Sequence, residues 1–237
     1  MKPLFVLQHD ADDPPGGVGT ALHELGVSFE VCRLDKGDEL PSWPDEASGI
    51  ISLGGAMHAT QTKEHPFLAE EITLLRHIVH AGGPVWGISL GAQLLTLAAG
   101  GDLFKCKHPE VGWIEIEKAA EDPLLHGITS PFIIFSWHEY GCKLPPTAHL
   151  VARRGESVEA FRAGGKAWAT LFHPEVDADM VPHWVDDAVR TYKEFDEEFA
   201  AALRTETARR LPENYPEFCR RVTENWVNAV GLAPAKK

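Results

Sequence analysis

The chain has 237 residues, of which 44 % are hydrophobic and 24 % charged, and acidic residues outnumber basic ones to give a net charge of −13. This composition is typical of a folded globular protein and excludes a disordered one, and the negative charge argues against nucleic acid or an anionic membrane as a partner. No apolar run approaches the ~20 residues of a membrane-spanning helix, and the N-terminus lacks the apolar core of a signal peptide.

The first hundred residues alternate between strand-like and helix-like patterns. Short apolar runs such as Leu4–Gln8 predict buried strands, and longer segments with apolar residues at helical spacing predict helices. We expect strands at 4–8, 27–34, 49–53 and 84–88, and helices at 17–25, 66–80 and 90–99. This order predicts an α/β fold with a mostly parallel sheet that helices cover on both faces.

The middle of the chain has little helix between its strand candidates, which lie at 112–117, 131–135, 149–152, 158–162 and 167–172. We expect them to form a small antiparallel elaboration of the sheet. From about residue 180 the pattern is helical, and we expect a helix at 194–210, a break at Pro212 and a last helix at 217–230. We divide the chain into a domain of residues 1–180 and a helical extension, 181–237, packed on that domain.

Gly87-Ile88-Ser89-Leu90-Gly91 fits the G-x-S-x-G pattern of a nucleophile elbow. It follows a predicted strand and begins a predicted helix, so a tight turn would present Ser89 beside the unpaired N–H groups of the helix start. By itself this pentapeptide is equally compatible with a buried glycine-rich turn.

Three other features point to chemistry at the same edge of the sheet, where parallel strands end and ligands gather. Gln93 lies one helical turn beyond Ser89 and so on the same face. Gly54-Gly55 ends an earlier strand and can offer backbone N–H groups to an oxyanion. His173-Pro174-Glu175 follows another strand candidate and supplies a base and a carboxylate.

Here the chain resembles the class I, triad-type glutamine amidotransferases. The segment 87–93 is similar to their G-I-C-x-G-x-Q, and His173-Pro174-Glu175 to their H-P-E. Val111-Gly112-Trp113 and Trp137-His138-Glu139 also look like segments of this family. The resemblance covers roughly residues 1–180 and implies a flavodoxin-like fold; stand-alone GMP-synthase-like members of the family also carry helical tails.

The resemblance implies roles for particular residues. Ser89 would stand at the nucleophile position, with His173 as general base and acid and Glu175 holding its ring. The N–H groups of Gly55 and Leu90 would bind the oxyanion. The residues expected to hold the substrate are Gly54, Gln93, Trp137 and His138.

The chain departs from the family at position 89, where the pattern has cysteine and this sequence has serine. A serine hydroxyl ionises far less readily than a thiol, so we expect glutamine hydrolysis to be reduced by orders of magnitude or abolished. Three explanations stay open: a serine introduced in place of cysteine, a natural serine hydrolase or peptidase on the same fold, or a non-catalytic glutamine-binding or regulatory subunit.

Glutamine, or another γ-glutamyl compound, is therefore the expected ligand. Because the sequence has neither a P-loop nor an S-G-G-x-D-S loop, a synthetase partner would have to use the ammonia. We expect no cofactor and no metal site, since His77 and His80 have no evident partner ligand. The four cysteines are widely spaced, which favours reduced thiols in a cytoplasmic protein.

Overall fold

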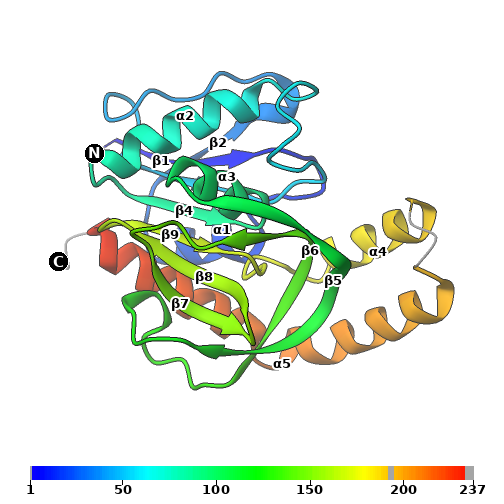
Figure 1. Ribbon diagram of the computed structural model, residues 1–237. Coiled ribbons are helices and arrows are strands. Elements are labelled where there is room, and N and C mark those ends of the chain that lie inside the picture. Colours follow the sequence, from blue (N-terminus) through cyan, green and yellow to red (C-terminus); the bar gives the residue numbers. More distant parts are fainter. Residues whose placement is uncertain (1, 192–194, 233–237) are drawn as a thin grey trace.

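The computed structural model describes residues 2–191 and 195–232 (Figure 1). Within these residues, one sheet has the strand order β2-β1-β3-β4-β9-β8-β7-β5-β6. Its parallel part comprises β1 (Leu4–Gln8), β2 (Phe29–Arg33), β3 (Gly49–Ser52), β4 (Val85–Ile88) and β9 (Ala167–Thr170). The predicted α/β architecture with a mostly parallel sheet is confirmed.

The antiparallel part comprises β8 (Ser157–Ala163), β7 (His149–Arg154), β5 (Asp102–Lys118) and β6 (Phe132–Lys143). β5 and β6 pair along most of their length and curve away from the parallel strands as a long ribbon (Figure 1). The elaboration was predicted, but both strands are longer than expected, since β5 begins before residue 112 and β6 continues past residue 135. The extra segment of β5 buries little on either side, and that of β6 buries polar residues such as Ser136 and His138, so neither shows the alternation of apolar residues that marks a strand.

Helices cover both faces of the sheet. α2 (Phe67–His80) and α3 (Leu90–Ala98) bury apolar residues such as Leu75 and Leu94 in a core on one face. α1 (Gly16–Glu24) and α5 (Glu197–Val230) contribute Leu22 and Trp226 to a core on the other face. α4 (Met180–Thr191) lies with the beginning of α5 near the ribbon of β5 and β6 (Figure 1). Short 3₁₀ turns occur at Leu34–Lys36 and Pro123–Leu125.

The expected break at Pro212 is wrong, because α5 continues through both Pro212 and Pro216. A proline in a helix removes one hydrogen bond and costs about 3 kcal/mol. The buried side chains of α5 outweigh this cost, since they follow one face at three- and four-residue spacing through the two prolines and beyond. They include Leu203, Thr207, Leu211, Tyr215, Cys219, Val222, Trp226 and Val230. The predicted start at Glu194 lies outside the described residues; the helix begins at Glu197, with Asp196 capping the N–H of Phe199 at 2.8 Å.

The C-terminal helices pack on the rest of the protein through buried residues such as Val181, Leu203 and Trp226. The division of the chain at residue 180 remains our proposal. None of the helices in the described part of the chain is both long and apolar enough to cross a membrane.

Candidate active site

Ser89 occupies a sharp turn between β4 and α3. Its φ of 51° and ψ of −107° make it the one non-glycine residue with positive φ among the described residues, and its N–H donates to the carbonyl of Thr170 at 2.9 Å. The two flanking glycines leave no room for a side chain. A Cβ on Gly87 would lie 2.4 Å from the carbonyl oxygen of Gly91, and a Cβ on Gly91 would lie 2.1 Å from the carbonyl oxygen of Ser52. A backbone held in this rare conformation costs energy and marks a functional position.

His173 and Glu175 form a buried pair just after β9. The imidazole Nδ1 lies 2.7 Å from Glu175 Oε1, and Nε2 lies 3.4 Å from the carbonyl oxygen of Trp137. Gly54 brings this pair close to Ser89, because a side chain on Gly54 would lie 3.2 Å from His173 Cε1 and 3.7 Å from Ser89 Cβ. The nucleophile candidate and the base candidate therefore border the same glycine.

The charges around His173 favour its protonated form. Burial by itself lowers the pKa of His173, but the charge and hydrogen bond of Glu175 and the charge of Asp13 outweigh it, so the pKa is raised. Burial raises the pKa of Asp13 to about 7; Glu175 and Asp10 add to this effect and His173 opposes it. The site thus holds a histidine whose pKa is raised and an additional carboxyl whose pKa is about 7.

The N–H groups expected to bind an oxyanion are unpaired among the described residues. Ser89 and Gly91 donate theirs to Thr170 and Leu53, whereas those of Leu90 and Gly55 have no backbone or side-chain acceptor. Leu90 is the first residue of α3, where an N–H has no partner within the helix. The two free N–H groups, one in the turn after Ser89 and one in the Gly54-Gly55 loop, could stabilise a negative charge that develops on a substrate oxygen.

A second buried pair lies beneath the Gly54-Gly55 loop. His9, directly after β1, places Nδ1 3.0 Å from the carbonyl oxygen of Gly54 and Nε2 2.7 Å from Glu71 Oε2. Ser52 donates to the other oxygen of Glu71 at 2.5 Å. Burial lowers the pKa of His9, but Glu71 more than compensates and the pKa is raised overall. This network fixes the loop that carries Gly55, and sequence reasoning did not identify it.

A cavity of about 450 Å³ opens at this edge of the sheet. Six residues predicted for the site line it, namely Gly55, Ser89, Gln93, Trp137, His138 and His173. The other three predicted residues, Gly54, Leu90 and Glu175, do not line the cavity but lie next to residues that line it. The side-chain oxygen of Gln93 accepts from the N–H of Ala59 at 3.3 Å, so its amide nitrogen is left to face a ligand.

The cavity is more acidic than the sequence analysis anticipated. Its lining includes five carboxylates, Asp10, Asp12, Asp13, Glu139 and Asp187, and no lysine or arginine among the described residues. Three of the aspartates follow β1, at the edge where parallel sheets bind ligands, and that position was the available signal. Glu139 follows the predicted residues Trp137 and His138 on β6, whereas Asp187 comes from α4, which the sequence did not place at the site.

The C-terminal helices hold the catalytic histidine candidate in place. The hydroxyl of Tyr215, on α5, donates to the carbonyl of His173 at 2.6 Å and accepts from the N–H of Phe135 at 3.2 Å. Trp184, on α4, lines the cavity with its ring centre 4.9 Å from that of His173. At the opposite end of the pair, the N–H of Gly17 donates to the carbonyl of Glu175 at 2.8 Å.

Comparison with known proteins identifies the family. Residues 18–188 match the family described as Glutamine amidotransferase class-I. The chain belongs to this family. The match confirms the resemblance seen in the sequence and places the chain with enzymes of the glutamine amidotransferase type; the replacement of a cysteine by Ser89 remains a prediction.

Relatives of known name agree with this assignment. The GMP synthase (glutamine-hydrolysing) of Aeropyrum pernix is 28 % identical over 188 residues, which are 76 % of this chain and 35 % of that protein. A γ-glutamyl-L-1-hydroxyisopropylamide hydrolase of a Pseudomonas species is 27 % identical over 140 residues, 54 % of this chain and 47 % of the hydrolase. The chain therefore spans about a third to a half of the length of these relatives.

The fold also matches solved structures. A glutamine amidotransferase from Thermotoga maritima superposes with a TM-score of 0.84 at 27 % identity, and the match covers 95 % of this chain and 98 % of that one. Because nearly all of both chains is covered, the likeness includes the helical C-terminal region.

Proposed function

We propose that this protein hydrolyses the side-chain amide of glutamine, or of a related γ-glutamyl compound, through an acyl-enzyme on Ser89. The observation that carries the proposal is the arrangement of Ser89, on its strained turn, beside the His173–Glu175 pair at the wall of one cavity. Nucleophile, base and orienting carboxylate are the three groups that such acyl transfer requires.

In the proposed reaction, Ser89 Oγ attacks the amide carbon and its proton passes to His173 Nε2. The N–H groups of Gly55 and Leu90 stabilise the resulting oxyanion. The carbon–nitrogen bond then breaks, His173 returns the proton to nitrogen, and ammonia leaves. Water attacks the γ-glutamyl ester while His173 takes its proton; His173 then passes that proton to Ser89 Oγ as the ester bond breaks, and glutamate is released.

The surroundings of His173 support both halves of this cycle. Glu175 accepts from Nδ1–H and so keeps Nε2 free to take a proton. The carbonyl of Trp137, 3.4 Å from Nε2, can accept the hydrogen of the imidazolium that forms. Since no hydrogen bond joins Ser89 to His173 among the described residues, the base has to be aligned when substrate binds, and we expect slow turnover by the serine form.

The test is release of ammonia and glutamate from glutamine by the chain with Ser89, by Ser89→Cys and by Ser89→Ala. We expect Ser89→Cys to be at least ~100-fold faster than the chain with Ser89, since a thiolate needs less help from its base, and Ser89→Ala to be inactive. An acyl-enzyme carrying one γ-glutamyl group should be visible by mass spectrometry on the serine form.

The other outcomes distinguish the alternatives. Rapid turnover by the serine form, with no gain in Ser89→Cys, would identify a serine hydrolase or peptidase. Glutamine binding by calorimetry without turnover in either form would replace the proposal with a non-catalytic glutamine-binding or regulatory subunit.

A second candidate substrate class is favoured by the charge of the cavity. Five carboxylates without a lysine or arginine among the described lining residues suit a γ-glutamyl amide whose leaving amine carries a second, positively charged nitrogen. The name of the Pseudomonas relative describes hydrolysis of a substituted γ-glutamyl amide, which supports the amide part of this class, and the charge of the cavity favours the second nitrogen. The test compares the γ-glutamyl amide of a diaminoalkane with that of a monoamine of equal length; faster hydrolysis of the charged compound, reduced in Asp187→Asn, supports it.

We propose that a separate synthetase uses the ammonia and adds it to an activated acceptor. The Aeropyrum relative is named as a synthase, and this chain matches 35 % of its length. The proposal predicts that glutamine hydrolysis increases when the synthetase and its activated acceptor are added, which a coupled ammonia assay can measure.

A further inference from the structure

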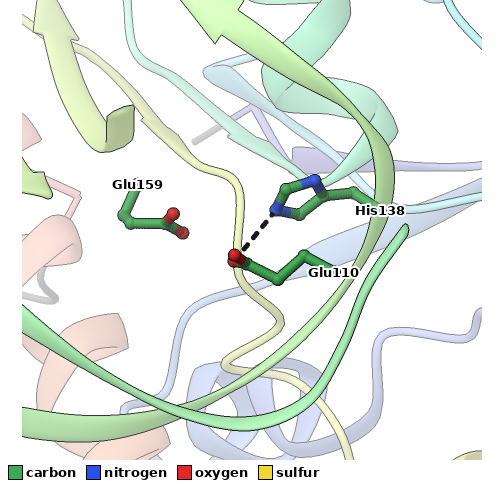
Figure 2. Close-up of side chains that lie close together, drawn as sticks. All are labelled: Glu110, His138 and Glu159. Carbon is green, nitrogen blue, oxygen red and sulfur yellow. Dashed lines mark ion pairs between the residues drawn. The ribbon is translucent and has the colours of Figure 1, made fainter. Parts of the chain in front are cut away.

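Three ionisable side chains converge beside the cavity on the antiparallel part of the sheet. Glu110 comes from β5, His138 from β6 and Glu159 from β8, and they point toward one another (Figure 2). One nitrogen or oxygen of each lies within 4.8 Å of those of the other two, and His138 Nε2 is 3.5 Å from Glu110 Oε1.

Two of these side chains are buried without a hydrogen-bond partner, although His138 forms the ion pair with Glu110. Glu159 is 0 % exposed and His138 7 % exposed, and neither the two oxygens of Glu159 nor the two nitrogens of His138 has a hydrogen-bond partner among the described residues. The buried Glu71 differs, because His9 and Ser52 use both of its oxygens. A buried carboxyl without a partner costs several kcal/mol, so the convergence calls for a positive ligand.

Among the described residues, Glu110 has a positively charged neighbour outside the cluster, and Glu159 forms no ion pair. Arg154 lies 2.6 Å from the Oε2 of Glu110, which leaves Oε1 directed toward His138. Burial pushes the pKa of Glu110 upward, but His138 and Arg154 outweigh it and the pKa is lowered. Burial and the charge of Glu110 raise the pKa of Glu159 to about 8. The ligand atoms of Glu110, His138 and Glu159 nevertheless remain close enough together for one ion to reach all three residues.

We propose that Glu110, His138 and Glu159 bind one divalent transition-metal ion, with zinc as the best match. Zinc accepts imidazole nitrogen and carboxylate oxygen as ligands in tetrahedral sites, and a water would supply the fourth ligand here. Magnesium and calcium prefer six or more oxygen ligands, which this cluster does not offer. This site departs from the sequence-based expectation of no metal, and its ligands are too far apart in the sequence to form a recognisable spacing.

The ion would serve as a clamp on the wall of the cavity. It would join β5, β6 and β8 at the point where the β5–β6 pairing shifts between Lys105 and Glu110. His138 directly follows Trp137, whose carbonyl faces His173. A bound ion would therefore fix the strand that contacts the imidazole without entering the reaction, and the metal site does not depend on the proposed hydrolysis.

The test is metal content. Purified protein is stripped with a chelator, reloaded with Zn²⁺, freed of excess metal by gel filtration and measured by elemental analysis. We expect about one zinc per chain, as for a site with three protein ligands, and a loss of at least ~90 % of it in Glu159→Gln. Glu115→Gln is the matched control, because Glu115 is exposed and lies on β5, the strand of Glu110. His80→Gln controls for zinc binding by surface histidines.

Thermal unfolding followed by circular dichroism provides the second readout. Zn²⁺ should raise the unfolding midpoint of the natural chain and of Glu115→Gln, because it binds the folded state, and leave that of Glu159→Gln unchanged. If Glu159→Gln does not fold, Glu110→Gln, at a half-exposed position, takes its place. Less than about a tenth of an equivalent of zinc in the natural chain, or equal retention by Glu159→Gln and Glu115→Gln, would overturn the metal site.

Discussion

The protein contains two buried histidine–carboxylate pairs of similar geometry and different position. His173–Glu175 and His9–Glu71 are both joined at 2.7 Å, and in both the carboxylate raises the histidine pKa against the effect of burial. The surroundings of the second ring nitrogen differ. In His173 this nitrogen lies 3.4 Å from the carbonyl oxygen of Trp137 and the residue lines the cavity, whereas in His9 it lies 3.0 Å from the carbonyl oxygen of Gly54 and the residue does not line the cavity. A perturbed histidine is thus available for proton transfer only where its other nitrogen can meet a ligand.

The largest difference is expected in turnover. In the Ser89→Cys background, His173→Gln should lower the rate of glutamine hydrolysis by about 10²–10⁴-fold, because the proton acceptor is lost. His9→Gln should lower it by less than about tenfold, since this side chain only positions the Gly54-Gly55 loop. Steady-state ammonia release measures both; equal losses would show that the two pairs are not functionally distinct.

The effect of His9 on stability should be larger than its effect on turnover. His9→Leu leaves Glu71 buried without its main partner, and we expect the free energy of unfolding to fall by about 3–5 kcal/mol. His9→Gln retains a donor for Glu71 and should cost less. Urea unfolding followed by fluorescence provides the values, and a loss below about 1 kcal/mol in His9→Leu would contradict a structural role.

Asp13, which influences His173 and His9, makes stability depend on pH. Its pKa is raised from 3.8 to about 7 on folding, so its favourable contribution is complete below pH 3.8 and is lost as pH rises through about 7. Asp13→Asn does not titrate. Relative to the natural chain, this variant should therefore gain about 2 kcal/mol in unfolding free energy between pH 5 and pH 8. A pH-independent difference would refute the shift.

The same variant should alter the pH profile of the reaction. The charge of Asp13 helps to raise the pKa of His173, and the imidazole has to be neutral to accept a proton. Removing that charge should move the acidic limb of kcat/KM to lower pH. Asp12→Asn, also at the cavity, is the control, because its charge does not contribute to the raised pKa of His173.

The smallest effect is expected from the hydrogen bond between the Tyr215 hydroxyl and the backbone carbonyl of His173. Tyr215→Phe removes the hydroxyl that donates to the His173 carbonyl and leaves the buried N–H of Phe135 without its acceptor. We expect a loss of about 1–2 kcal/mol in unfolding free energy and a change in rate below about tenfold. Thermal melts and glutamine assays measure the two; an unchanged melting curve would show that the hydroxyl is dispensable.

The nucleophile side of the candidate site could be proposed from the sequence because its residues lie close together along the chain. Gly87, Ser89 and Gly91 are adjacent, and His173 and Glu175 are two positions apart, so their proximity needs no knowledge of the fold. Strand-to-helix alternation was enough to place Gly54-Gly55 near them.

The remainder depends on contacts between distant segments. Glu71 meets His9 across 62 positions, and nothing in a pattern of single residues indicates that pairing. Asp13 acquires its raised pKa only through burial beside Glu175. The extra length of β5 and the continuation of α5 through Pro212 are similarly set by partners elsewhere in the chain.

The contact between Tyr215 and His173 has a consequence for the order in which the protein matures. A ribosome delivers the elbow and the histidine first, and the hydroxyl that secures the histidine backbone follows 42 positions later. During synthesis, the backbone of His173 should therefore gain its last anchor only after that tyrosine has left the exit tunnel, so the site would reach its final rigidity when α5 closes over the sheet.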